Sequence, residues 1–150
     1  MDRRFLPDDF GDQGTRHEVN VFVFRVHDRG MEYLLLQPQP QHDGVWRPVV
    51  NTVRLEEDLE HAVLRSVRQE TGLEFPFDLL QGKCPPVHDC GDLQLVGWPF
   101  AFQTRTPEVE VRSHSDLADC EWTRFEDAMR LLTDDMHRQS LLQLHWELAA

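Results

Sequence analysis

The chain has 150 residues, of which 40% are hydrophobic and 28% are charged, a composition typical of one globular domain with its own core. Its net charge of −12 argues against a nucleic acid or an anionic membrane as the main partner, because both are negatively charged. The chain has no long apolar run, no apolar signal-peptide core and an odd number of cysteines (three), so we expect a reduced cytoplasmic setting.

The N-terminal residues are polar and rich in Asp and Gly. This composition predicts a flexible N-terminal arm over 1–17, which Phe5, Leu6 and Phe10 are able to attach to the body of the protein. A single domain is then expected over 18–150, because no repeat or linker divides this part of the chain.

Two strands and a helix are predicted in the first half of the domain. Residues 18–26 alternate in polarity and are rich in Val and Phe, and 31–38 return after a turn, which together predict a hairpin. A polar loop with two prolines leads to a short extended segment over 45–53. A helix is predicted to begin near Glu57 or Asp58 and to end at Gly72.

The second half begins with an irregular loop over 81–92, which contains two adjacent prolines. Strands are predicted over 93–105 and 117–123, a helix over 125–132 and a terminal helix from 136 onwards. This order of strands and helices predicts an α/β (α+β) fold, with a mixed sheet and helices packed on its faces.

One carboxylate in the predicted central helix stands out. At 100° per residue Glu70 projects near the middle of an apolar stripe, with Ser66 beside it and Gln69 on its flank. A carboxylate in such a place is costly unless a cation or several donors meet it. The alternative is that the last helical turn projects into solvent. The stripe consists of Leu59, Ala62, Val63 and Val67.

The spacing of Glu57, Arg65, Glu70 and Gly72 resembles the Nudix box. In that family a Gly, five residues, a Glu and seven residues precede Arg-Glu-aliphatic-x-Glu-Glu-x-Gly-aliphatic. Trp46 and Pro48 also resemble the family's approach to the box. The resemblance implies a Nudix-like α/β/α sandwich around a mixed sheet, whose active site is built from strand, loop, helix and loop.

The resemblance also implies a metal site, because three box glutamates of the family are its usual magnesium ligands. Those positions hold Ser66, Gln69 and Glu70 here, so only Glu70 is retained. The first box Gly is replaced by Asn51, whose backbone carbonyl remains a candidate ligand. Asp116 lies six residues before Trp122 and is the candidate second carboxylate, or alternatively a turn-forming residue. We therefore expect Mg²⁺, with Mn²⁺ as the alternative ion, to be weakly bound.

Two functional hypotheses follow from the resemblance. The first is a metal-dependent pyrophosphohydrolase that cleaves a phosphoanhydride bond in a nucleotide or nucleoside diphosphate derivative, loosely like the dihydroneopterin triphosphate pyrophosphatase branch. The second is a catalytically impaired Nudix-fold module for nucleotide binding or regulation, which Ser66 and Gln69 favour. The candidate residues are, for catalysis, Glu70, Gln69, Arg65 and Glu57, and for metal, Glu70, Asn51 and Asp116.

Other chemistry-bearing residues are weaker candidates. Cys84, His88 and Cys90 lack the spacing and the fourth ligand of a structural zinc site, which favours a polar loop. Trp46 and the strand aromatics Trp98 and Phe102 are able to stack a nucleobase, although such aromatics usually lie in the core. The apolar C-terminal helix and the N-terminal arm are candidate contacts of a homodimer.

Overall fold

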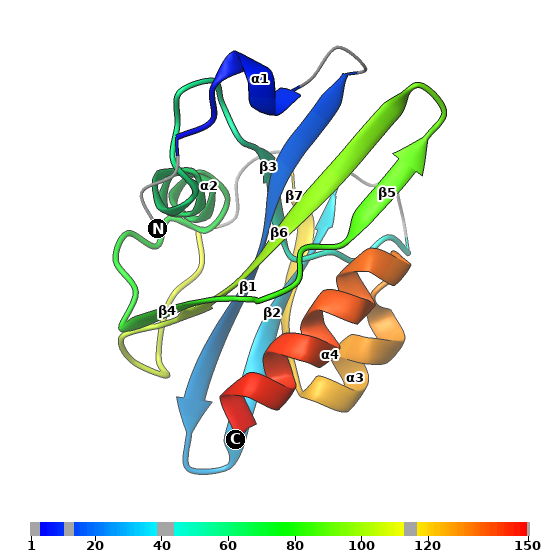
Figure 1. Cartoon of the computed structure of the whole chain (residues 1–150). Helices are drawn as coiled ribbons and strands as arrows, with labels where there is room; N and C mark the ends of the chain where they lie inside the picture. Colours follow the sequence, from blue (N-terminus) through cyan, green and yellow to red (C-terminus); the bar gives the residue numbers. More distant parts are fainter. Residues whose placement is uncertain (1–3, 11–13, 39–43, 113–116, 150) are drawn as a thin grey trace.

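Seven strands form one mixed β-sheet, with helices packed on both of its faces (Figure 1). The computed structural model describes residues 4–10, 14–38, 44–112 and 117–149. Its layers confirm the α/β/α sandwich predicted from the sequence. No helix in these ranges is long and apolar enough to cross a membrane.

The long strand β1 is the centre of the sheet, whose main path runs β4-β6-β1-β2-β7. β1 pairs with β6 in parallel and with β2 and β3 antiparallel, and β5 pairs antiparallel with β6. The strands in chain order are β1 (Thr15–His27), β2 (Gly30–Pro38), β3 (Val49–Thr52), β4 (Asp78–Gln81), β5 (Val87–Cys90), β6 (Leu93–Gln103) and β7 (Leu117–Thr123).

The helices divide between the two faces of the sheet: α1 and α2 lie on one side, and α3 and α4 lie on the other (Figure 1). Their bounds are α1 (Pro7–Phe10), α2 (Leu59–Thr71), α3 (Phe125–Leu131) and α4 (Asp135–Ala149). Helix α2 has the predicted ends. The Asp58 carboxylate accepts a hydrogen bond from the His61 amide at the start, and Gly72 adopts a left-handed conformation with φ of 79° at the end.

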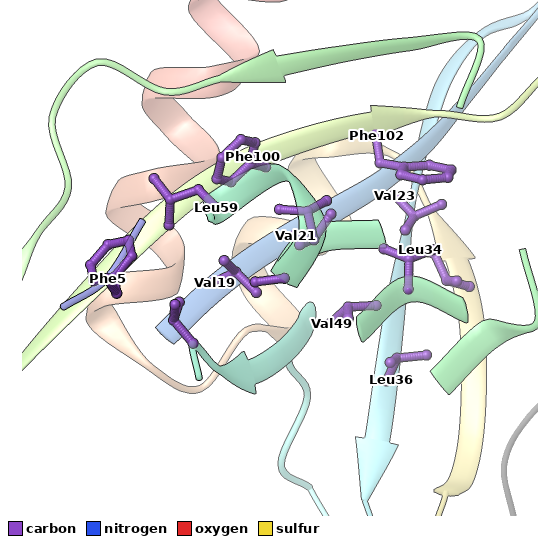
Figure 2. Close-up of a cluster of buried hydrophobic side chains, with 14 residues drawn as sticks. Phe5, Val19, Val21, Val23, Leu34, Leu36, Val49, Leu59, Phe100 and Phe102 are labelled. Atoms are coloured by element: carbon purple, nitrogen blue, oxygen red, sulfur yellow. The ribbon is translucent and has the colours of Figure 1, made fainter. Parts of the chain in front are cut away.

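Both faces of the middle of β1 are buried, which explains its apolar run from Val21 to Phe24. Val19, Val21 and Val23 point toward α2, where they meet Phe100 and Phe102 of β6 (Figure 2). Phe22 and Phe24 face α3 and α4 and belong to the second core. That core is made of Phe22, Phe24, Tyr33, Leu35, Ala101, Ala128, Leu132, Leu141 and Leu144.

The structure changes two of the predicted segments. Strand β1 begins at Thr15, three residues earlier than expected, because its first residues pair with β6. The predicted loop over 81–92 contains strand β5, and antiparallel pairing with β6 stabilises this strand despite the nearby prolines. Phe5 is fully buried in the α2-side core, and its amide donates to the Glu57 carbonyl at 3.1 Å. The division into an arm and a domain near residue 17 remains a prediction.

Candidate functional site

A buried ion pair holds the start of helix α2 against strand β3. Arg65 Nε donates to Glu57 Oε2 at 2.8 Å, and Arg65 Nη2 donates to Glu57 Oε1 at 2.9 Å. The same Nη2 donates to the Thr52 carbonyl at 2.9 Å, which connects the helix to the end of β3. The two residues that the box resemblance pairs therefore meet, and they orient the helix relative to the sheet.

Glu57 is ionised because its donors outweigh its burial. Burial alone would raise the pKa of this carboxyl, but hydrogen bonds from Arg65, the Arg54 amide and His61 lower it, together with the Arg65 charge, from 4.5 to about 2. The His61 Nδ1 atom lies 2.8 Å from Glu57 Oε2 although most of its side chain is exposed. His61 thus has a partner that the sequence did not indicate.

A strained turn brings Glu57 to this position. Glu56 has a φ of 65°, a left-handed conformation that residues with a side chain rarely adopt. Its amide donates to the Phe5 carbonyl, while the Phe5 amide donates to the Glu57 carbonyl. The segment before α1 therefore covers the turn and stabilises its strained backbone.

At the other end of α2, Glu70 meets a cation. Arg47 Nη1 donates to Glu70 Oε2 and Arg47 Nη2 donates to Glu70 Oε1, both at 3.1 Å. The two side chains are only 21% and 17% exposed. Arg47 is itself held in place, because its backbone exchanges two hydrogen bonds with Leu36 of β2 and its Nη1 also donates to the Pro48 carbonyl. The ion pair satisfies the carboxylate that the helical periodicity placed on a core-directed face.

The two neutral residues of the box engage other partners. Ser66 is fully buried, and its hydroxyl donates to the Ala62 carbonyl at 2.6 Å within the helix. Gln69 is exposed, and its Oε1 accepts from Asn51 Nδ2 at 3.2 Å. The Ser66 side chain therefore faces the packed interior, whereas Gln69 lies at the surface beside the end of β3.

The three box positions that the resemblance assigns to magnesium contribute a single carboxylate here. Magnesium binds one or more carboxylates together with waters and ligand oxygens. Glu70 is the only carboxylate at these three positions, and Arg47 donates to both of its oxygens. Within the described ranges no group of three or more His, Cys, Asp or Glu residues is placed to hold a metal. Asp116 lies outside the described residues, so the predicted ligand set of Glu70, Asn51 and Asp116 stays a prediction.

A pocket of about 580 Å³ opens beside Arg47. The loop before β3 forms one wall, the junction of α3 and α4 forms another, and β5 contributes a residue. This volume is within the range of small-molecule sites. The lining residues are Val45, Trp46, Arg47, His88, Thr133, Asp134, Asp135, Met136 and His137.

Polar side chains are buried between the sheet and α4, on the side of the sheet that this pocket adjoins. The Asn20 side-chain amide, His137 Nδ1 and Ser140 Oγ are buried and have no hydrogen-bond partner within the described part of the chain. Asn20 fits there because Gly97 on the neighbouring strand has no Cβ, which would lie 2.4 Å from Asn20 Nδ2. Burial lowers the pKa of His137 below its usual range, so the ring is neutral at pH 7.

Glu18 also belongs to this region. Burial and the nearby Asp134 carboxylate raise its pKa to about 7, while the Arg47 charge acts in the opposite direction. Glu18 and Asn20 are polar residues that flank the first residue of the buried, mostly apolar segment Val19–Phe24, and this was the available sequence signal. Neither these two residues nor Arg47 was predicted from the sequence.

The aromatic candidates separate into different environments. Trp46 lines the pocket. Trp98 packs against Phe5 and donates from Nε1 to His17 Nδ1 at 3.1 Å, and Phe102 is fully buried in the α2-side core. Trp46 is therefore the one of these three placed to stack on a ligand in the pocket.

The sequence profile of the NUDIX domain matches residues 16–144. No curated protein matches the chain in sequence.

Three solved structures illustrate the likeness of fold. The Ap4A hydrolase of C. elegans in a binary complex has a TM-score of 0.69 and 18% identity, covering 89% of this chain and 98% of that one. The NUDIX domain of Shewanella oneidensis NrtR, complexed with ADP ribose, has a TM-score of 0.73 and 19% identity, and the match covers 90% of this chain and 89% of that one. The E. coli dihydroneopterin triphosphate pyrophosphohydrolase has a TM-score of 0.71 and 15% identity, and the match covers 85% of this chain and 92% of that one. At these identities the likeness concerns the fold.

Proposed function

The chain belongs to the Nudix family, and from this premise we propose that it binds a nucleotide or a nucleoside diphosphate derivative as a Nudix-fold binding module. The observation that carries this proposal is the ion pair between Arg47 and Glu70. It neutralises the one carboxylate left at the three metal-ligand positions of the box, so we expect the site to bind divalent cations weakly. Binding a ligand, unlike hydrolysing it, does not need the full set of metal-binding carboxylates.

The pocket beside Arg47 supports binding of a ligand with a ring and a phosphate group. Trp46 provides an aromatic surface and Arg47 provides a planar cation at the same opening. The likeness to a NUDIX domain complexed with ADP ribose is consistent with a ligand of this class.

The second candidate function is metal-dependent hydrolysis of a phosphoanhydride bond, with Glu70, Gln69, Arg65 and Glu57 in the catalytic site. The intact pair of Glu57 and Arg65 favours it, since this pair holds the box helix in a defined position relative to the sheet. The likeness to an Ap4A hydrolase and to a dihydroneopterin triphosphate pyrophosphohydrolase suggests substrates to test.

One experiment separates the two functions. ADP ribose, Ap4A, dihydroneopterin triphosphate and nucleoside triphosphates are titrated into the protein by calorimetry, with Mg²⁺ and with EDTA. Release of phosphate, pyrophosphate and nucleoside monophosphate is followed in parallel. Saturable binding of at least one compound without turnover is the expected result. Mg²⁺-dependent turnover that is lost in Glu70→Gln would establish the hydrolase instead, and neither binding nor turnover across the panel would contradict both functions.

A further inference from the structure

Arg47 connects two parts of the site. Its guanidinium holds both oxygens of Glu70 on helix α2, and the same residue lines the pocket on the side of α4. Its charge also acts on Glu18 and His137, which belong to the region beside the pocket. A single side chain is thus shared by the box helix and the pocket.

The guanidinium has donors left for a ligand. Arginine carries five N–H donors, and the Glu70 carboxylate and the Pro48 carbonyl accept three hydrogen bonds from them. The Nε–H and one Nη2–H have no acceptor among the described residues. Because Glu70 fixes the plane of the guanidinium, these donors are oriented before a ligand arrives, which reduces the entropy lost on binding.

The charges around the pocket leave Arg47 as the natural partner for an anion. Among its described lining residues, Arg47 is the only one with a permanent positive charge, while Asp134 and Asp135 are acidic. A phosphate group entering this pocket needs a cation, because the protein as a whole carries a charge of −12.

We propose that Arg47 takes the place of a divalent cation at the box carboxylate Glu70 and binds the phosphate groups of the ligand directly. The replacement is consistent in charge. One guanidinium balances one carboxylate, and the other two box positions, Ser66 and Gln69, are neutral. A planar guanidinium also matches both carboxylate and phosphate oxygens. The identity of the ligand as a phosphorylated compound rests on the proposed function, whereas the exchange of metal for Arg47 at Glu70 does not.

The test compares Arg47→Gln with a matched control. Arg25→Gln removes the same charge from another partly buried ion pair, in which Arg25 Nη2 lies 2.8 Å from Glu32 and the side chains are 23% and 21% exposed. Two probes are used with each variant and with the native protein. Calorimetry in EDTA measures binding of inorganic pyrophosphate, and electron paramagnetic resonance measures binding of Mn²⁺ alone.

The two probes are expected to respond in opposite directions. The native protein binds pyrophosphate in EDTA, and Arg47→Gln weakens this binding about tenfold or more, as loss of a charge-assisted bidentate contact requires. The same variant binds Mn²⁺ several-fold more tightly, because Glu70 no longer has a cation. Adding Glu70→Gln to Arg47→Gln removes the gained Mn²⁺ binding. Arg25→Gln leaves the affinities for pyrophosphate and for Mn²⁺ within about twofold of those of the native protein, because its ion pair is partly exposed and lies elsewhere.

Unchanged Mn²⁺ binding in a folded Arg47→Gln protein would overturn the exchange at Glu70. Pyrophosphate binding that needs Mg²⁺ in the native protein would overturn direct recognition by Arg47, while nucleotide binding in the panel would still stand. Arg47→Lys keeps the charge and loses the planar fork, so its pyrophosphate affinity is expected between those of the native protein and Arg47→Gln. A melting temperature for each variant shows that the protein remains folded.

Discussion

Replacing Arg65 with methionine tests the buried frame of the box most directly. Arg65→Met keeps an unbranched side chain of similar length but leaves the Glu57 carboxylate buried without its main partner. Removing one member of a buried ion pair destabilises proteins by about 3–5 kcal/mol. The Arg54 amide and His61 still contact Glu57. We therefore expect the free energy of unfolding to fall by an amount at the lower end of this range, about 3 kcal/mol.

The pKa of Glu57 is lowered by the same ion pair together with the hydrogen bonds from the Arg54 amide and His61. A decrease from 4.5 to about 2 corresponds to about 3 kcal/mol of native-state stabilisation at neutral pH. Because the folded pKa is the lower one, this contribution is present above pH 4.5 and is lost as the pH falls toward 2. In Arg65→Met the acid dependence of stability over this window should therefore shrink.

Urea denaturation at pH 7 and at several lower pH values measures both effects. The control is the double variant Glu57→Gln with Arg65→Met, which removes the buried charge and should recover part of the lost stability. If Arg65→Met lowers the free energy of unfolding by less than about 1 kcal/mol, the ion pair of Glu57 and Arg65 is not important for stability. A double variant that is no more stable than Arg65→Met would lead to the same conclusion.

Three further predictions can be checked by simple measurements on single-residue variants. Phe5→Ala should lower the free energy of unfolding, measured by urea denaturation, by about 3–5 kcal/mol because Phe5 is fully buried. Leu6→Ala should lower it by less than about 0.5 kcal/mol because Leu6 is 51% exposed. Equal effects of the two substitutions would argue that the N-terminal segment does not pack as described. Glu18→Gln should stabilise the protein by about 1–2 kcal/mol at pH 8 but not at pH 4, since the raised pKa of Glu18 makes the native state lose stability as pH rises from 4.5 to about 7. Gln69→Glu should strengthen Mn²⁺ binding at the helix surface without lowering the melting temperature. Ser66→Glu should lower the melting temperature, because it introduces a carboxylate at a fully buried position. A stable Ser66→Glu protein with strong Mn²⁺ binding would contradict the packing of this face of the helix.

The comparison of sequence and structure is clearest along helix α2. Its apolar stripe, its cap at Asp58 and its stop at Gly72 depend on residues within a few positions of one another, so they were readable in advance. The strands β1 and β2 were predictable for the same reason. The strand β5 was not, because two prolines precede it and its stability comes from pairing with β6.

The candidate site divides in a similar way. The box spacing indicated the family and the supporting pair of Glu57 and Arg65, which the structure brings together. The burial of Ser66, by contrast, depends on what packs over that face of the helix, and a helical wheel does not show it. The significance of Asn20 on β1 also needed the fold, since its side-chain amide is buried next to α4 without a hydrogen-bond partner among the described residues.

By itself, the sequence determined that Glu70 lies on the side of its helix that carries the apolar stripe, and that two neighbouring box positions are neutral, but it left open whether Glu70 meets a counterion or solvent. Only the tertiary structure decided that the counterion is Arg47, a residue 23 positions earlier in the chain. Pairing of the Arg47 backbone with Leu36 on β2 places its side chain at the end of α2 and at the mouth of the pocket. Helical periodicity is a local property of the chain, whereas this contact depends on how a loop, a strand and a helix pack together.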